Sequence, residues 1–328
     1  MPLNTQSKVL LDQLAALGGK PLEEMTPAEA REDRARAMEA FKALSGPAPE
    51  VARVRDRTIP GPAQPVPVRI YWPKSLADHA ASPGAAERFP ALVYFHGGGW
   101  VFGNLDQVDQ VCRVLANSAG YVVVSVDYRL APEHKFPAAA EDAYAAAQFV
   151  ATHAEELGID ASRIAVAGDS AGGNLAAVVC LMARDRGGPS LMFQLLVYPC
   201  TDYHDDRPSM REFAENHLLT RASMRYFWNH YLARPEQGRD PYASPIYAPT
   251  LAGLPPALVI TAECDPIRDQ GEAYAQRLKQ AGVAAEVKRY EGVIHAFFQM
   301  GAVIDAGKQA VEDAAAALRG AAQLAATA

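Results

Sequence analysis

Residues 163–176 read RIAVAGDSAGGNLA, and this stretch decides the fold. The hydrophobic run 164–167 predicts a buried strand, and the segment 172–186 that follows it predicts a helix. Between them, GDSAG at 168–172 has the G-x-S-x-G pattern of a nucleophile elbow, a sharp turn from strand to helix. Such a turn lifts the serine hydroxyl above the edge of the sheet, and its glycines let the neighbouring backbone come close. We therefore expect Ser170 to be a nucleophile; the alternative is a serine that caps the N-terminus of the helix.

Strands and helices alternate along most of the chain. Hydrophobic runs that suit strands buried on both faces of a parallel sheet lie at 91–95, 121–126, 164–167, 193–197 and 257–261. Strands with one solvated face are expected where polar and apolar residues alternate, at 51–55 and 66–71, and one more strand is expected at 285–290. Helices are expected at 105–119, 138–157, 171–186, 267–281 and 305–325. This order predicts an α/β fold, a mostly parallel sheet of about eight strands flanked by helices.

Two segments interrupt the alternation. Residues 1–46 predict amphipathic helices, and residues 201–240 form a charged, aromatic insertion between two core strands. Insertions that follow sheet strands often build lids over a site. We therefore expect a helical cap made of residues 1–46 and 201–240 over a core made of residues 47–200 and 241–328. A polar loop is expected at 75–89.

A serine hydroxyl is a weak nucleophile until a base removes its proton. In chains with such an elbow, a carboxylate and then a histidine follow the serine in sequence. Asp265 and His295 each come after an expected strand, so both fall at the sheet edge where Ser170 also lies. We expect these three residues to form a catalytic triad. Two other carboxylates are alternatives for the acid: Asp269, one turn into the next helix, and Glu263, at the end of the strand.

A glycine run, HGGGW at 96–100, directly follows another expected strand. Successive glycines leave backbone N–H groups exposed and let a carbonyl group approach closely. A phosphate-binding loop is the competing interpretation, and it is disfavoured because no Lys-Ser/Thr pair and no helix follow at once. We expect the N–H groups of Gly98, Gly99 and Ala171 to form an oxyanion hole, and His96 to fix the loop.

Several motifs agree in order along the chain. They are HGGGW (96–100), YRLAPEHKFPAAAEDA (128–143), GDSAGGNLA (168–176), YP (198–199), DPIRDQG (265–271) and GVIHAF (292–297). Together they resemble the hormone-sensitive-lipase-like family of carboxylesterases. The resemblance implies an α/β-hydrolase core, a triad of Ser170, Asp265 and His295, an HGGG oxyanion loop, a helical cap and no cofactor. Ile267 and Gln270 depart from the family's frequent Leu and Glu, at positions that are not catalytic.

The same resemblance implies a serine carboxylesterase that works through an acyl-enzyme intermediate. We expect a covered pocket that suits short- to medium-chain acyl esters. The candidate residues for its wall are Trp100, Phe213, Leu218 and Leu219, with Tyr226 and Phe227 also on the apolar side of the insertion. Amide or lactone hydrolysis by the same triad is an alternative. A different class is a non-catalytic binding protein, as in the plant gibberellin receptors that this family resembles, but such a protein would normally lack a member of the triad.

The composition limits partners and location. The chain has 328 residues, a formal net charge of -7 and 49% hydrophobic residues, as in ordinary globular proteins. Because phosphate binding needs a basic surface, we expect a small-molecule ester as partner and no nucleic acid. No apolar run reaches the ~20 residues that span a bilayer. The four cysteines form no CxxC pair and no zinc-ligand spacing, so we expect reduced thiols, no metal and a cytoplasmic protein. The strand at 285–290 should lie near a sheet edge, where a second copy could pair to form a homodimer.

Overall fold

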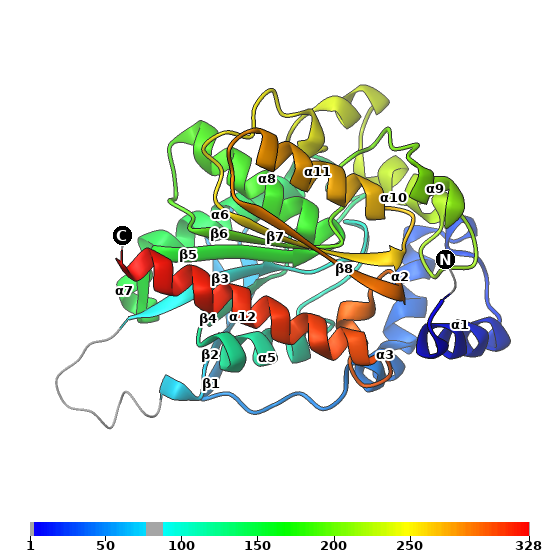
Figure 1. The fold of residues 1–328 in the computed structure, drawn as a ribbon, viewed down its shortest axis with the longest axis horizontal. Helices are drawn as coiled ribbons and strands as arrows, with labels where there is room; N and C mark the ends of the chain where they lie inside the picture. The colour runs from blue at the N-terminus through cyan, green and yellow to red at the C-terminus, as the bar shows by residue number, and fades with distance from the viewer. Residues whose placement is uncertain (1–2, 77–87, 328) are drawn as a thin grey trace.

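The computed structural model describes residues 3–76 and 88–327, and its centre is one eight-stranded sheet (Figure 1). The strands are β1 Arg53–Ile59, β2 Val66–Trp72, β3 Phe89–Phe95, β4 Val122–Val126, β5 Ile159–Asp169, β6 Phe193–Val197, β7 Ala257–Cys264 and β8 Ala285–Ile294. Their order across the sheet is β1-β2-β4-β3-β5-β6-β7-β8. The pairs β1–β2 and β2–β4 are antiparallel and the other pairs are parallel, which confirms the predicted sheet. Most of the loop expected at 75–89 lies outside the described residues.

Strand β1 differs from the prediction that the first two strands each have one solvated face. The prediction holds at the start of β2, where Val66 and Val68 are buried and Pro67 between them is exposed. In β1 every residue before Ile59 is exposed or half-buried. The reason is its place at the sheet edge combined with the charged sequence RVRDR, which puts charges on both faces.

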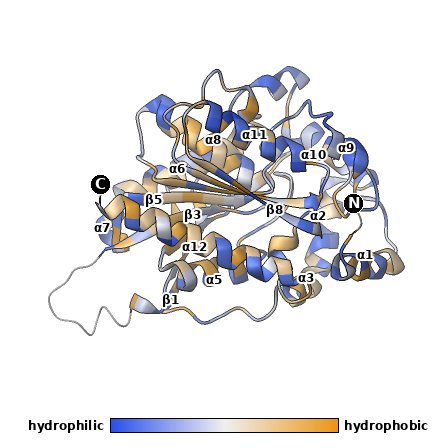
Figure 2. Cartoon of the chain, in the orientation of Figure 1, coloured by the Kyte–Doolittle hydropathy of each residue, from blue (hydrophilic) through white to orange (hydrophobic). Residues whose placement is uncertain are grey.

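Helices cover both faces of the sheet (Figure 1). One layer contains α6 Ala138–Thr152, α8 Ala171–Arg186 and α11 Arg268–Gln280, and the other contains α5 Asp109–Ala119 and α12 Asp305–Thr327. The buried side chains accordingly form two clusters, one on each side of the sheet. The central helix α8 is buried at every residue from 171 to 183. Figure 2 shows hydrophobic and hydrophilic colours mixed along α12, as expected for a helix with one face on the core.

Two segments far apart in sequence lie at the same end of the molecule, where the parallel strands terminate (Figure 1). The first contains α1 Thr5–Leu17, η1 Leu22–Glu24, α2 Pro27–Arg36 and α3 Met38–Ser45. The second contains α9 Pro208–Glu212, α10 Arg221–Tyr231 and η2 Pro235–Arg239. Helix α10 contacts η1 directly. The two segments predicted to form a cap therefore meet above one edge of the sheet.

The remaining helical elements are short: α7 Ala154–Leu157, η3 Pro245–Tyr247 and η4 Phe297–Gln299. Within residues 3–76 and 88–327, every helix is too short or too polar to cross a membrane.

Candidate active site

The turn at Ser170 has the geometry of a nucleophile elbow. β5 ends at Asp169, α8 begins at Ala171, and Ser170 between them has φ 58° and ψ -116°. This conformation is rare for a residue with a side chain and costs on the order of 1–3 kcal/mol. Gly172 makes the turn feasible, because a Cβ atom there would lie 1.9 Å from the carbonyl oxygen of Phe95. The elbow packs α8 tightly against β3 and leaves Ser170 partly exposed at the sheet edge.

Ser170, His295 and Asp265 form a continuous hydrogen-bonded chain. The Nε2 atom of His295 lies 2.9 Å from Ser170 Oγ, and Nδ1 lies 2.6 Å from Asp265 Oδ2. The second carboxylate oxygen of Asp265 accepts a hydrogen bond from the N–H of Ile267 at 2.9 Å. Because the fully buried Asp265 faces Nδ1, a neutral imidazole carries its proton there and offers Nε2 as an acceptor to the serine hydroxyl. The arrangement can remove the serine proton during attack on a carbonyl carbon.

The two alternative acids bind other parts of the chain. Glu263 accepts a hydrogen bond from the N–H of Gly292 at 2.7 Å and so links the ends of β7 and β8. Asp269 accepts a hydrogen bond from the N–H of Ser209 at 2.9 Å and so holds α9 in place. The carboxylate that contacts the His295 ring is therefore that of Asp265.

The glycine loop and the start of α8 present backbone N–H groups near Ser170. In the described part of the chain, the N–H groups of Gly98, Gly99 and Ala171 have no protein acceptor. Gly98 and Gly99 have φ values of 117° and 60°, which favour glycine. A Cβ atom on Gly99 would also lie 2.1 Å from the ring of Phe227. Free donors of this kind can stabilise the negative oxygen of a tetrahedral intermediate, although this role remains a prediction.

His96, before the glycines, shapes this loop. Its buried ring stacks on the ring of Tyr128 with centroids 4.3 Å apart, and its Nδ1 lies 2.8 Å from the carbonyl oxygen of Gly97. The Tyr128 hydroxyl donates a hydrogen bond to the His96 carbonyl oxygen at 2.7 Å. Burial lowers the pKa of His96 to about 4, so the ring is neutral at neutral pH.

Asp169 is a site residue that the sequence did not single out, because it occupies a variable position of the G-x-S-x-G pattern. Its carboxylate accepts hydrogen bonds from the Tyr94 hydroxyl at 2.9 Å, the Gly97 N–H at 3.2 Å and the Gln299 side chain at 2.7 Å. Asp169 therefore connects the elbow to the glycine loop and to the segment after His295. Burial raises the pKa of Asp169 to about 6, although the Tyr94 hydrogen bond and the nearby His295 act in the opposite direction.

The raised pKa of Asp169 predicts a pH-dependent contribution to stability. Because an unfolded Asp titrates near 3.9, the folded protein binds more protons than the unfolded chain between about pH 4 and pH 6. The contribution of Asp169 to the free energy of unfolding should therefore fall by about 2 kcal/mol as the pH rises through this range. Asp169→Asn cannot ionise and should lack this change. Urea unfolding of the wild type and of Asp169→Asn at about pH 4 and pH 6.5 measures the difference between their free energies of unfolding. If this difference is the same at both pH values, the assignment is contradicted.

A cavity of about 90 Å³ contains Ser170 and His295 in its wall. The apolar part of that wall comprises Leu22, Phe41, Phe102, Leu218, Leu219 and Phe227. Residues from the segment 1–46 and from the segment 201–240 thus line the same cavity as the serine. Leu218 and Leu219 line this cavity, as we expected from the sequence.

Trp100 and Phe213 do not line the cavity, contrary to expectation. Trp100 is 1% exposed, and its ring stacks on the ring of Tyr231 with centroids 4.2 Å apart. Phe213 is also buried, with its ring 5.0 Å from the ring of His217 and 5.4 Å from the guanidinium of Arg268. Both aromatic side chains contribute to the packing of the insertion instead of the substrate pocket.

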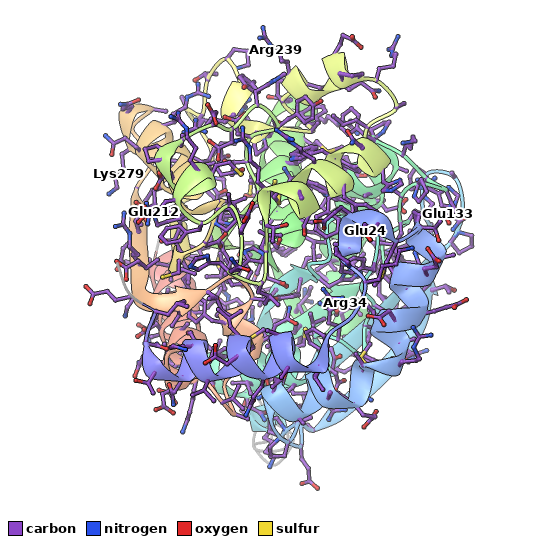
Figure 3. The ribbon with its side chains drawn as sticks, turned by 90° about the vertical axis from the view of Figure 1, so that its right-hand side faces the viewer. Glu24, Arg34, Glu133, Glu212, Arg239 and Lys279 are labelled. Carbon is purple, nitrogen blue, oxygen red and sulfur yellow. The ribbon has the colours of Figure 1, made fainter. Side chains whose placement is uncertain are left out.

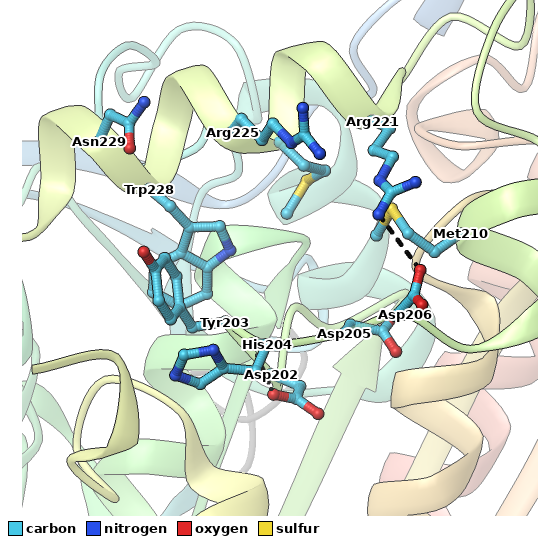
Figure 4. Close-up of a pocket in the computed structure, with 11 residues that line it drawn as sticks. Asp202, Tyr203, His204, Asp205, Asp206, Met210, Arg221, Arg225, Trp228 and Asn229 are labelled. Atoms are coloured by element: carbon cyan, nitrogen blue, oxygen red, sulfur yellow. Dashed lines mark hydrogen bonds and ion pairs between the residues drawn. The ribbon is translucent and has the colours of Figure 1, made fainter. Parts of the chain in front are cut away.

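A second cavity of about 310 Å³ lies between α10 and the loop after β6 (Figure 4). Its acidic side chains are paired: Asp202 accepts a hydrogen bond from Arg207 at 2.8 Å, and Asp206 contacts Arg221 at 3.2 Å, the dashed line in Figure 4. None of the three residues of the hydrogen-bonded chain lines this cavity. The ion pair between Asp206 and Arg221 connects the loop after β6 to α10.

Comparisons with known proteins agree with this geometry. A family model described as alpha/beta hydrolase fold matches residues 92–299. Esterase LipI of Mycobacterium tuberculosis is 44% identical over 268 residues, which cover 81% of this chain and 82% of LipI. The ethyl acetate hydrolase of Pseudomonas putida is 40% identical over 279 residues, which cover 84% of this chain and 86% of that protein. The structure of a hyperthermophilic esterase from Pyrobaculum calidifontis superposes with a TM-score of 0.90 and 46% identity, over 98% of this chain and 99% of that one.

Proposed function

The chain belongs to the hormone-sensitive-lipase-like family of the alpha/beta hydrolase fold, and on that premise we propose that it is a serine carboxylesterase. The observation that carries the proposal is the hydrogen-bonded chain from Asp265 through His295 to Ser170. Relatives named as esterases support ester hydrolysis as the reaction. The roles of the individual residues follow from their geometry.

In the first half of the reaction the ester binds with its carbonyl oxygen near the N–H groups of Gly98, Gly99 and Ala171. His295 Nε2 takes the proton of Ser170 as Oγ bonds to the carbonyl carbon. The carbonyl oxygen becomes an oxyanion, which the three N–H groups stabilise by hydrogen bonds. Collapse of this intermediate breaks the bond to the alcohol oxygen, and His295 donates its proton to the leaving alcohol.

In the second half a water molecule attacks the acyl-enzyme. His295 accepts a proton from this water, the same N–H groups hold the second oxyanion, and collapse returns the proton to Ser170 Oγ as the carboxylic acid leaves. Throughout both halves Asp265 keeps the imidazole in one tautomer and stabilises its protonated form. His295 mediates every proton transfer in this sequence, and the backbone N–H groups supply hydrogen bonds to the two oxyanions.

We further propose that residues 1–46 and 201–240 act as a cap that selects the acyl chain. Both segments line the cavity beside Ser170, and its volume of about 90 Å³ is small beside the ~300–1,000 Å³ of typical ligand pockets. A small pocket whose wall is partly apolar favours short and medium chains over long ones.

This proposal predicts the order of substrates. We expect kcat/KM for 4-nitrophenyl butyrate and hexanoate to exceed that for the palmitate ester by about tenfold or more, because the long chain must leave the cavity and lie exposed to water. Initial rates in one detergent concentration, with every ester below its solubility limit, give the comparison. A higher kcat/KM on palmitate would overturn the proposed preference.

Two proposals concern the surroundings of the enzyme. The four cysteines, Cys112, Cys180, Cys200 and Cys264, are buried and free, which supports the cytoplasmic location expected from the sequence. Strand β8 forms one edge of the sheet, which supports a homodimer in which two copies pair along this strand.

A further inference from the structure

Arg34, on helix α2, lines the same cavity as Ser170. Figure 3 looks onto the end of the molecule where the N-terminal helices lie, and it labels Arg34 near the centre of that face. The guanidinium carbon lies 4.8 Å from the ring centroid of Phe41 and 4.6 Å from that of Phe102. Within residues 3–76 and 88–327, the guanidinium has neither an ion-pair partner nor a hydrogen-bond acceptor.

The other two arginines of α2 are paired. Arg31 forms two hydrogen bonds to the carboxylate of Glu133, at 2.8 and 2.7 Å. Arg36 lies 3.2 Å from Asp33 and is largely exposed, with 71% of its side-chain surface accessible. Arg34 thus differs from its neighbours in both position and partners, although all three have the same side chain.

An unpaired guanidinium in the cavity wall can bind an acceptor that enters the cavity. The group keeps its charge and carries five N–H donors, and in the described part of the chain none of them is used by another protein group. Burial lowers the pKa of Arg34, while Asp33 acts in the opposite direction. The carboxylate that also lines the cavity, Asp169, already accepts hydrogen bonds from three donors. The free hydrogen-bonding capacity of Arg34 is therefore available to a substrate.

We propose that Arg34 determines specificity by binding a carboxylate of the substrate, so that the preferred esters carry an anionic group a few carbons from the ester bond. This inference rests on the proposed esterase function. A carboxylate matches the guanidinium because both are planar and can form two parallel hydrogen bonds. The rings of Phe41 and Phe102 limit the directions in which the guanidinium can point. The methylene groups between the ester and the carboxylate would contact the apolar wall that Leu218 and Leu219 help to form.

Matched pairs of esters test this proposal. Monoethyl succinate, glutarate and adipate are compared with ethyl 4-methylpentanoate, 5-methylhexanoate and 6-methylheptanoate, in which a neutral isopropyl group replaces each carboxylate. A fourth pair, 4-acetoxybutanoate and 4-methylpentyl acetate, places the carboxylate on the alcohol side. Hydrolysis of each ester is followed by pH-stat titration. The measured quantity is the ratio of kcat/KM for the anionic ester to kcat/KM for its neutral partner. Using a ratio cancels changes that affect both esters equally.

Arg34→Met removes the charge and keeps an apolar stem against the two phenylalanines. We expect the ratio for the best pair to fall tenfold or more in this variant, because charge-assisted hydrogen bonds are lost. Arg34→Lys keeps the charge and should retain a ratio above that of Arg34→Met. The control, Arg36→Met on the same helix, makes the same change in net charge outside the cavity and should leave the ratio unchanged. Thermal unfolding of each variant verifies that it is folded.

The outcomes separate this inference from the proposed function. A fall of fivefold or more in Arg34→Met, with Arg36→Met unchanged, supports the carboxylate site. A smaller fall, or an equal fall in Arg36→Met, overturns it while ester hydrolysis by the wild type stands. If the wild type hydrolyses none of the eight esters and no 4-nitrophenyl ester, the proposed function itself fails.

Discussion

Replacing Ser170 by alanine is expected to lower kcat by about 10⁶-fold on any ester that the protein hydrolyses. The variant keeps the oxyanion donors and the pocket but lacks the oxygen that forms the acyl-enzyme. Because alanine has the same Cβ atom, the turn between β5 and α8 should remain and the melting temperature should change little. Initial rates on 4-nitrophenyl butyrate, with circular dichroism and thermal unfolding as tests of folding, measure both parts of the prediction.

A matched control is Ser190→Ala. Ser190 is exposed and lines a surface depression that contains none of the triad residues, so its replacement should leave kcat and KM unchanged. If purified Ser170→Ala keeps more than about one hundredth of the wild-type rate, the serine is not the nucleophile.

Asp265→Asn should lower kcat by about 10⁴-fold. The asparagine oxygen can still accept the hydrogen bond from Ile267, which turns the NH2 group toward His295 Nδ1. The imidazole must then carry its proton on Nε2, the atom that faces Ser170, and can no longer accept the serine proton. KM should change much less than kcat, because Asp265 is buried and does not line the cavity.

Asp269→Asn is the control for this variant, because Asp269 lies on the same segment and was the alternative acid. Its contacts are with Ser209 and Arg268, so we expect kcat to stay within about tenfold of wild type. If instead the Asp269 variant loses about 10⁴-fold and the Asp265 variant retains most activity, the acid has been assigned to the wrong carboxylate.

The parts of the site that the sequence revealed are those fixed by local chain geometry. GDSAG could be recognised because strand, turn and helix are contiguous there, and the turn needs small residues at set positions. The sequence predicted that Asp265 and His295 lie close together, because each follows a strand and parallel strands end at one edge of the sheet. The strands themselves run further than expected, β7 to Cys264 and β8 to Ile294, so both side chains directly follow a strand.

What the sequence did not reveal depends on which way side chains point after the chain has folded. Arg34 stands in a run of charged residues, AREDRAR at 30–36, where every arginine looks solvent-exposed until the helix is placed over the sheet. Trp100 follows three glycines, and only the path of that loop decides that it packs on Tyr231 and not in the cavity. Asp169 has no sequence pattern of its own, because its three donors come from distant segments.

The most direct test of the central claim is a titration with a fluorophosphonate, a reagent that reacts with serines activated by a triad. Peptide mass spectrometry locates the adduct while ester hydrolysis is measured on the same samples. We predict one adduct per chain, on Ser170, with activity lost in proportion to its occupancy. Full labelling of Ser170 with undiminished ester hydrolysis, or complete loss of hydrolysis with Ser170 unmodified, would contradict the account.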